Sequence, residues 1–446
     1  MEKAGITKDV PRSQDESHSA YPPHSIPNGD ENLQSPAKNH TLARVHFFTL
    51  CLTLFLAGWN DGTLGPLLPR IQQVYKVNYT IVSMIFIFAC TGFISGSIVN
   101  IYITDRFGFG KTIVFGALCQ VVAYSIQCTA PPFPVFVMAY TINGAGISLQ
   151  ARISSCATRI HVAQAMGFVA SLRHRPEVKM SFLTSAYGVG AFIAPLVSTQ
   201  FAILPRWSFY FLVSLSLALT NTTLLCLVFK FKRQDECLQE AGEILPGRPA
   251  SRDGNSFGMV MRNRSAHIMA LFTLVYVGVE VTIGGWSVTF IRNVRGGGQS
   301  SGYISSGFFG GLTVGRILLL WVNSKIGERL VVFIYAFLAL SLEFVVWFVP
   351  SLIGDAIAVS IVGLLLGPMF PIIMNQSKHI IPRRILTASI GWISGLGQAG
   401  SALFPFITGA LAEKHGIKSL QPTLIGMIVA MACLWALVPS SARRTD

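Results

Sequence analysis

Residues 80–104 read TIVSMIFIFACTGFISGSIVNIYIT and contain no Asp, Glu, Lys or Arg. A helix must carry about 20 predominantly apolar residues to cross the hydrocarbon core of a bilayer. This stretch meets that length, and the first charged residues after it are Asp105 and Arg106. It therefore predicts a membrane-spanning helix, so the fold depends on how many such stretches the chain contains.

The composition of the whole chain also indicates a membrane protein. Of its 446 residues, 51% are hydrophobic and 12% are charged, whereas soluble domains are about one quarter charged. The net charge of +14 is concentrated in loops and gives no reason to expect a nucleic-acid partner. The eight cysteines show no CxxC spacing and are expected to be small buried apolar side chains, not metal ligands or disulfides. We expect one membrane domain in contact with lipid.

Twelve stretches qualify as predicted spans, arranged as six, a polar loop and six. They are residues 45–69, 80–104, 112–130, 133–150, 181–204 and 207–229, then 266–291, 303–322, 330–349, 352–376, 385–411 and 420–438. The polar, Ser- and Pro-rich residues 1–44 are expected to be a disordered tail. The predicted organisation is this tail, an N-terminal half (45–229), a central loop (230–265), a C-terminal half (266–438) and a short tail (439–446).

The positions of Lys and Arg predict the orientation. With the N-terminus inside, 19 of the Lys and Arg residues near the ends of the spans fall on the inner side and 7 on the outer side. Inner loops of membrane proteins carry the excess of these residues. Both termini and the central loop are therefore predicted to be cytoplasmic.

The two groups of six spans resemble each other in sequence. Three correspondences share an offset of 219 residues: Asp61 to Gly65 with Glu280 to Gly284, Asp105 to Gly108 with Ser324 to Gly327, and Gly144 with Gly363. The offset falls to 207 between Gly188 and Gly395. The pattern predicts an internal duplication, as many transporters have. The first half would then carry extra residues, either an insertion near 151–162 or ordinary variation in loop length.

Two acidic residues lie within predicted spans at corresponding positions, Asp61 in the first and Glu280 in the seventh. Ionisable groups at membrane depth are costly and by default suggest function. A two-fold relation between the halves would make the two carboxylates face each other across a central cavity, where burial disfavours the charged form and suits proton exchange. The alternative is a structural hydrogen bond to a neighbouring helix.

Uncharged polar and aromatic residues could line the same cavity. They are Asn60, Asn143, Tyr187, Trp286, Asn375, Trp392 and Gln398. The alternative for each is hydrogen bonding between helices or anchoring at the membrane interface. Arg316 could pair with an acid or a carbonyl that the sequence does not identify, Glu343 is expected to be structural, and Asp355 is expected at the outer interface.

The loop between the second and third spans carries a family resemblance. Its residues Asp105, Arg106, Gly108 and Lys111 resemble the G-x-x-x-D-R-x-G-R-[RK] signature of the major facilitator superfamily, although Ile101 replaces the first glycine and the second basic residue comes one position late. The resemblance implies the superfamily fold, an all-α membrane protein with 12 transmembrane helices in two pseudo-symmetric six-helix halves. It also implies that these four residues form a cytoplasmic gating motif, in which the Asp contacts the N-terminal end of a helix in the other half.

Within the superfamily, the chain resembles the fucose-permease-like branch and fungal members of the bypass-of-stop-codon type. The residues that carry this likeness are Gly58 to Gly62, Gly65 to Pro69, Gly367 to Pro371 and Gly391 to Pro405. The resemblance implies that Asp61 binds sugar or protons. It also implies an acid in the fourth span, which this chain lacks, and that absence places simple sugar–proton symport in doubt.

The function predicted from these observations is secondary transport of a small organic solute by alternating access, coupled to H⁺. The alternatives are a membrane sensor that does not transport, or a defective paralogue, which the missing acid and the 151–162 segment would favour. We expect no enzymatic activity, metal or cofactor, since no GxxxxGK[ST] or HExxH motif occurs. The expected partners are the lipid bilayer and a small-molecule substrate, the expected state is a monomer, and the expected location is the plasma membrane or a vacuolar membrane.

Overall fold

The structure is a computed structural model that describes residues 40–151, 176–232 and 256–439. The elements of the first part of the chain are α1 (His40–Tyr75), α2 (Tyr79–Phe107), α3 (Phe109–Cys128), α4 (Phe133–Ala151), α6 (Pro176–Ile203), η1 (Trp207–Phe209) and α7 (Tyr210–Phe229). Those of the second part are α9 (Ser256–Arg262), α10 (Arg264–Val294), η2 (Gln299–Gly302), α11 (Tyr303–Ile326), α12 (Glu328–Phe348), α13 (Leu352–Leu366), α14 (Met369–Ile380), α15 (Arg383–His415), η3 (Ile417–Ser419) and α16 (Leu420–Leu437). The all-helical architecture predicted from the sequence is confirmed in these residues.

Helices cover all twelve predicted spans. In the described part of the chain, nine helical segments are long and apolar enough to cross a membrane by length and composition. Helices α1, α4 and α15 are not among these nine segments, so their crossing of the membrane stays a prediction. In α1, the polar pair Asn60 and Asp61 in the middle of the helix lowers the mean hydropathy.

Three boundaries differ from the prediction. The span 352–376 is divided into α13 and α14, because Pro368 has no N–H to continue the hydrogen-bond ladder. Helix α1 begins at His40, inside the predicted tail, and α9 lies inside the predicted central loop. Residues 1–39 of the tail, 233–255 of the loop, 440–446 and most of the 151–162 segment lie outside the described residues.

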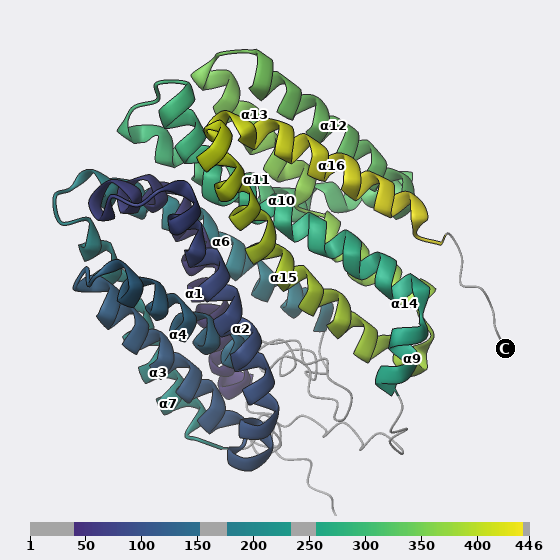
Figure 1. Cartoon of the computed structure of the whole chain (residues 1–446). Helices are drawn as coiled ribbons and strands as arrows, with labels where there is room; N and C mark the ends of the chain where they lie inside the picture. Colours follow the sequence, from purple (N-terminus) through teal and green to yellow (C-terminus); the bar gives the residue numbers. More distant parts are fainter. Residues whose placement is uncertain (1–39, 152–175, 233–255, 440–446) are drawn as a thin grey trace, which may run out of the picture.

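The helices form two groups, α1 to α7 and α9 to α16, which lie as two bodies in Figure 1. In the first group, α4 packs between α2 and α3, and α6 packs along α1. In the second, α13 packs between α11 and α12, and α15 packs along α10. The same neighbours therefore recur in both groups, which is the pseudo-symmetry expected from the sequence.

The repeat extends to individual atomic contacts. A Cβ built on Gly92 would lie 2.0 Å from the carbonyl oxygen of Thr141, and one on Gly311 would lie 2.1 Å from that of Ser360. Both members of the second pair follow those of the first by 219 residues. Gly144 with Ala89 and Gly363 with Phe308 show the same relation at 2.2 Å. Glycine at these points lets the helix backbones touch.

The turns between α2 and α3 and between α11 and α12 also correspond. Gly108 has φ 83° and Gly327 has φ 94°, a region that side chains disfavour. Each glycine N–H closes its preceding helix, by donating to Thr104 and to Asn323 respectively, at 3.0 Å. The sequence match at these turns therefore reflects a shared backbone requirement.

We define the terminal side of the bundle as the one where α1 begins and α16 ends, and the far side as the opposite one. Contacts between the two groups gather on the far side. The backbone N–H of Tyr79 donates to Glu413 Oε2 at 2.9 Å, and Asn293 Nδ2 donates to the Tyr79 hydroxyl at 2.9 Å. Near mid-length, the Cys90 thiol donates to the Gln398 carbonyl at 3.3 Å.

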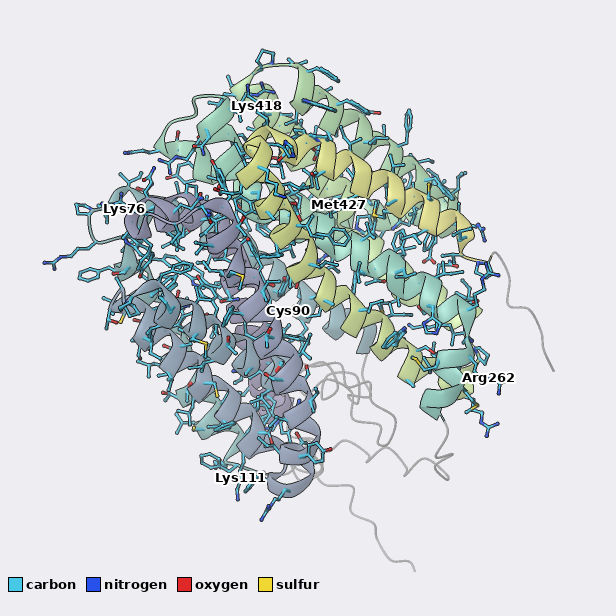
Figure 2. The ribbon with its side chains drawn as sticks, in the orientation of Figure 1. Lys76, Cys90, Lys111, Arg262, Lys418 and Met427 are labelled. Carbon is cyan, nitrogen blue, oxygen red and sulfur yellow. The ribbon has the colours of Figure 1, made fainter. Side chains whose placement is uncertain are left out.

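Figure 2 shows the same arrangement, and its labelled residues mark the two sides. Lys76 and Lys418 mark the far side, where the two groups meet, and Cys90 lies at their junction. Lys111 and Arg262 mark the terminal side, at the separated tips of the two groups. The described bundle is thus joined on the far side and splayed on the terminal side.

Candidate functional site

The middle of α1 is fixed against α6 by two glycines. A Cβ on Gly58 would lie 1.9 Å from the carbonyl oxygen of Tyr187, and one on Gly62 would lie 2.4 Å from that of Ala191. No side chain fits at either position, so the two backbones touch. This contact brings the Tyr187 phenol alongside Asp61.

An adjacent face of α1 is anchored to α7. The indole N–H of Trp59 donates to Ser214 Oγ at 2.8 Å, and its ring stacks on that of Tyr210 with centroids 5.7 Å apart. One turn later, the Thr63 hydroxyl is 2.6 Å from the Tyr210 hydroxyl. With both faces held, the rotation of α1 about its axis is set, and Asp61 points away from the core of its half.

Asp61 is exposed although it lies deep within a long helix. The Tyr187 hydroxyl donates to its Oδ2 at 2.6 Å, and Asn60 Nδ2 approaches its Oδ1 at 3.4 Å. An exposed carboxylate at this depth can be reached by water and by ions. The short bond from the phenol is of the charge-assisted kind.

The second half supplies the other acid and a cation. Glu280 in the middle of α10 is 13% exposed, and its Oε1 is 3.9 Å from Nη2 of Arg316 on α11. The Arg316 guanidinium also lies over the ring of Tyr187, 5.9 Å from its centroid. A chain of contacts therefore crosses from one half to the other: Asp61, Tyr187, Arg316 and Glu280.

The charges in this cluster do not balance. The chain of contacts holds two carboxylates and one guanidinium, so it has a net negative charge when all three groups are ionised. An uncompensated charge is costly where water is partly excluded. The arrangement favours uptake of one proton or one other positive charge from the solvent that reaches Asp61.

Of the predicted polar residues, Asn60, Asn143 and Tyr187 come together with Asp61. Asn143 of α4 is buried, and its Nδ2 donates to Asn60 Oδ1. The amide oxygen of Asn143, Oδ1, is buried and has no hydrogen bond among the described residues. The first half thus presents a carboxylate, a phenol and two amides within one neighbourhood.

The remaining predicted residues lie elsewhere and make packing contacts. The indole N–H of fully buried Trp286 donates to the Pro405 carbonyl at 3.0 Å, and Asn375 Nδ2 donates to Glu328 Oε1 at 2.7 Å. Trp392 donates to His267 Nδ1 at 3.2 Å. Gln398 donates to Ser401 Oγ at 3.2 Å, while its backbone meets Cys90. Except for the Gln398–Ser401 bond within α15, these are interhelix hydrogen bonds of the kind named above as the alternative.

The predicted gating motif lies at the terminal side. Arg106 is exposed, with its guanidinium 5.8 Å from the Phe107 ring centroid, and Lys111 is exposed in the first turn of α3. Gly108 forms the turn between them. The side chain of Asp105 lies outside the described atoms, so its predicted contact with the other half stays a prediction.

The partner of Arg316 is the feature that the sequence did not identify. Glu280 and Arg316 belong to different helices and share no local motif, so only the packing of α10 beside α11 joins them. Two other acids lie inside the second half. Glu343 is 1% exposed and neither of its carboxylate oxygens has a hydrogen bond among the described residues, so its structural role stays a prediction. Asp355, expected at the outer interface, is buried and pairs with Arg295 Nε at 2.9 Å.

Comparisons with known proteins agree with this architecture. Residues 50–405 match the Major Facilitator Superfamily. The chain is 27% identical to bypass of stop codon protein 6 of Saccharomyces cerevisiae over 421 residues, which cover 87% of this chain and 81% of the yeast protein. It is 25% identical to a glucose/galactose transporter of Brucella abortus over 390 residues, covering 86% and 90%. It is 21% identical to a glucose/mannose transporter of Bacillus subtilis over 398 residues, covering 88% and 93%.

A solved structure shares the fold. The crystal structure of a bacterial homologue of the human lysosomal transporter Spinster, in an inward-facing and unoccupied conformation, superposes with a TM-score of 0.69. The alignment covers 90% of this chain and 97% of that one at 11% identity. At this level of identity the likeness concerns the fold alone.

Proposed function

Because this chain belongs to the Major Facilitator Superfamily, we propose that it moves a sugar-like or other small organic solute by alternating access, coupled to H⁺. That it is a multi-pass membrane protein and a transporter of small solutes is supported by the family and by the sugar transporters among its relatives. The class of solute and the coupling ion are the parts proposed here.

One observation carries the proposal for proton coupling. The exposed Asp61 and the half-buried Glu280 are connected through Tyr187 and Arg316, and the guanidinium can compensate only one of the two acids. When a proton binds, the cluster becomes neutral and the cost of closing it away from water falls. When the proton leaves, Arg316 can compensate whichever carboxylate lies closer. A proton can therefore bias the two halves between conformations.

The solute class is argued from the polar groups next to Asp61. Asn60 and Tyr187 offer amide and hydroxyl donors and acceptors, which suit the hydroxyl groups of a sugar, and the buried Asn143 holds the Asn60 amide in place. Two relatives are named as transporters of glucose with mannose or galactose. We infer that a neutral hydroxylated molecule of hexose size binds between these groups and Arg316.

The orientation follows from the loop charges. The terminal side carries most of the Lys and Arg residues near the helix ends, and we propose that it faces the cytoplasm. In that orientation, the described arrangement opens toward the cytoplasm and is joined at the outer surface. We keep the plasma membrane or a vacuolar membrane as the proposed location, and a monomer as the proposed state.

The experiment is counterflow in proteoliposomes that contain the purified chain. Vesicles are loaded with one unlabelled compound from a panel of hexoses and lipophilic cations, and uptake of the labelled compound is followed. Counterflow needs exchange and no net proton movement, so it tests solute transport separately from coupling. We expect exchange of at least one hexose by the wild type, and its loss in Asn60→Ala and Asn143→Ala.

The control is Thr223→Ala on α7, an exposed residue whose hydroxyl bonds to the Leu219 carbonyl of its own helix, and it should retain exchange. If no compound exchanges while the protein stays folded, the sensor or defective-paralogue reading replaces the proposal. If only lipophilic cations exchange, the sugar class is wrong.

A further inference from the structure

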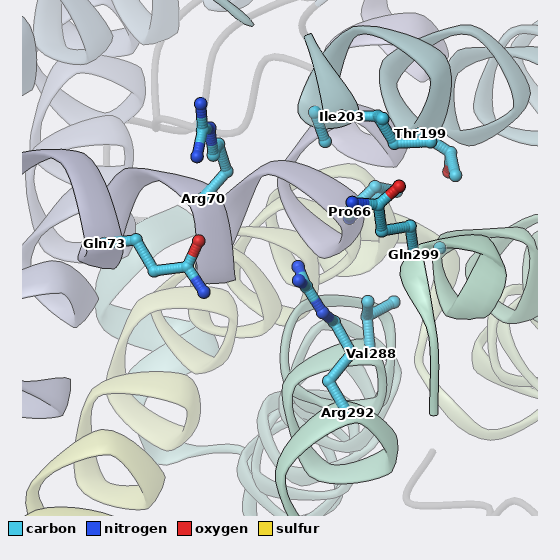
Figure 3. Close-up of a pocket in the computed structure, with 10 residues that line it drawn as sticks. Pro66, Arg70, Gln73, Thr199, Ile203, Val288, Arg292 and Gln299 are labelled. Atoms are coloured by element: carbon cyan, nitrogen blue, oxygen red, sulfur yellow. The ribbon is translucent and has the colours of Figure 1, made fainter. Parts of the chain in front are cut away.

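A cavity lies on the far side, further along α1 than Asp61. It has a volume of about 70 Å³ and lies where the two halves meet. Pro66, Arg70 and Gln73 of α1 and Thr199 of α6 come from the first half, while Arg292 of α10 and Gln299 of η2 come from the second. Figure 3 shows these residues, with Arg292 extending from α10 toward the face of α1 that bears Pro66 and Gln73.

The charged side chains that line this cavity are all positive. Two of the ten described residues that line it are arginines, one from each half, and none of the ten is acidic. Closing the halves therefore brings two like charges to the same small space. This arrangement opposes closure unless an anion lies between the guanidinium groups.

The hydrogen-bonding capacity of Arg70 is only partly used. Its Nη2 donates to the Leu204 carbonyl at 3.3 Å, while its Nε is buried and has no hydrogen bond among the described residues. A buried N–H on a cation that lacks a partner costs free energy, so the Arg70 guanidinium is incompletely satisfied where it lies. The carboxamides of Gln73 and Gln299 are exposed and can supply further donors at the cavity edge.

The surroundings also favour an anion. Two far-side acids of the described helices already have partners, since Asp355 pairs with Arg295 and Glu413 accepts from Tyr79. They are therefore engaged elsewhere. A volume of this size can accept a small group, since a single water needs only about 10–15 Å³ on the same measure.

We propose that this cavity binds a small oxyanion, a carboxylate or phosphate group, between Arg70 and Arg292. Guanidinium groups match the two oxygens of such anions in a fork geometry. Because the lining comes from both halves, the site exists only while the far side is closed. The anion therefore stabilises this conformation over the opposite one and acts as an effector of the transport cycle. The inference does not depend on which solute the chain carries.

The test is binding of radiolabelled inorganic phosphate to the full chain in phospholipid-free detergent at constant ionic strength. We expect saturable binding of one phosphate per chain, with acetate as a competitor and with chloride inactive. Arg292→Gln and Arg70→Gln should each weaken binding about tenfold or more, the loss expected for one charge-assisted contact. Arg206→Gln is the matched control, since Arg206 lies on the same side over the Phe209 ring and outside the cavity.

Thermal unfolding distinguishes a variant that loses phosphate binding from one that loses its fold. The melting temperature of the wild type and of Arg206→Gln should rise with phosphate, and that of Arg292→Gln should not. Without phosphate, Arg292→Gln should melt no lower than the wild type, because it removes the repulsion. The proposal is overturned if phosphate binds the wild type no better than chloride, or if the cavity variants bind it as tightly as Arg206→Gln does.

Discussion

Tyr187 is the residue on which the two halves of the candidate site converge. Its hydroxyl donates to Asp61 and its ring lies under Arg316, so one side chain contacts the acid of the first half and the cation of the second. Its backbone carbonyl meets Gly58, which fixes its position along α1. A small displacement between the halves must therefore change the surroundings of Asp61.

Replacing Tyr187 by Phe should separate the two roles. The ring remains for Arg316, while the carboxylate of Asp61 loses a donor that favours its ionised form. We expect the pH at which uptake is half-maximal to move upward and the fold to persist. Uptake measured between pH 5 and 8 in proteoliposomes, beside Tyr187→Ala, checks this; an unchanged profile in the Phe variant would remove the hydroxyl from the mechanism.

The pair of Glu280 and Arg316 should behave as a coupled unit. Arg316→Gln leaves Glu280 without its cation, so we expect a loss of transport and a loss of stability of about 1 kcal/mol, since the pair is long and partly exposed. Adding Glu280→Gln to that variant should restore part of the stability. Melting temperatures of the four proteins form the cycle, and simple additivity would show that the two residues do not interact.

At the scale of the helices, the glycine contacts decide how closely neighbours pack. The α2–α4 and α11–α13 pairs repeat the same backbone contacts in the two halves. Glycine lowers the helix propensity of each segment, and the close packing of the two helix backbones offsets that cost. Of these glycines, Gly144 and Gly363 were visible in the sequence as a correspondence at one offset, although the residues they contact were not.

Gly92→Ala should therefore be harmful. Its Cβ would lie 2.0 Å from the Thr141 carbonyl oxygen, so α2 and α4 must separate, at a cost of about 1–3 kcal/mol. Gly426→Ala in α16 is the matched control, because its Cβ meets nothing within 4 Å and alanine favours a helix by about 1 kcal/mol. Thermal unfolding in detergent compares them. Equal melting temperatures would contradict the described packing of α2 on α4.

The division of the tenth predicted span shows what hydropathy alone cannot resolve. Residues 352–376 are continuously apolar enough for one helix, yet Gly367 and Pro368 end α13 and begin α14. A Cβ on Gly367 would lie 2.3 Å from the Leu312 carbonyl oxygen, so the break also sits at a contact with α11. The signal was the Gly-Pro pair itself, which membrane helices tolerate often enough to be ambiguous.

The whole molecule is described in one conformation, joined on the far side. Its contacts there involve α2 with α15, α6 with α11 and α1 with α10, and they reach inward to the level of Cys90 and Gln398. Asp61 and Gly395 are exposed near mid-length. This combination predicts that the central site is reached from the terminal side.

Thiol labelling tests that access. In a background without the eight native cysteines, Gly395→Cys should react with an impermeant maleimide from the cytoplasmic face only, because nothing lies within 4 Å of its Cβ position. Lys418→Cys, on the far side, should react only from the opposite face. Labelling of the Gly395 variant from the outer face alone would reverse the proposed orientation or the described conformation.

The sequence predicted the helices well because membrane insertion leaves its mark on every span, and it predicted the two halves because duplication leaves repeated motifs. It identified Asp61 and Glu280 by their cost at membrane depth. It could not distinguish Tyr187, which joins the site, from Trp286, which is buried in packing, because both are aromatic residues near mid-span. That distinction depends on helix rotation, which Trp59 and the glycines of α1 set through contacts between distant segments.

Asp61 and Glu280 are proposed to couple solute movement to protons. The measurement that tests this coupling most directly is solute-driven proton movement in proteoliposomes, followed with an internal pH dye, for the wild type, Asp61→Asn and Glu280→Gln. We predict proton movement with the solute in the wild type, and its loss in at least one variant that still exchanges solute in counterflow. Solute-driven proton movement that persists in both variants, or solute flux without proton movement in the wild type, would contradict the account.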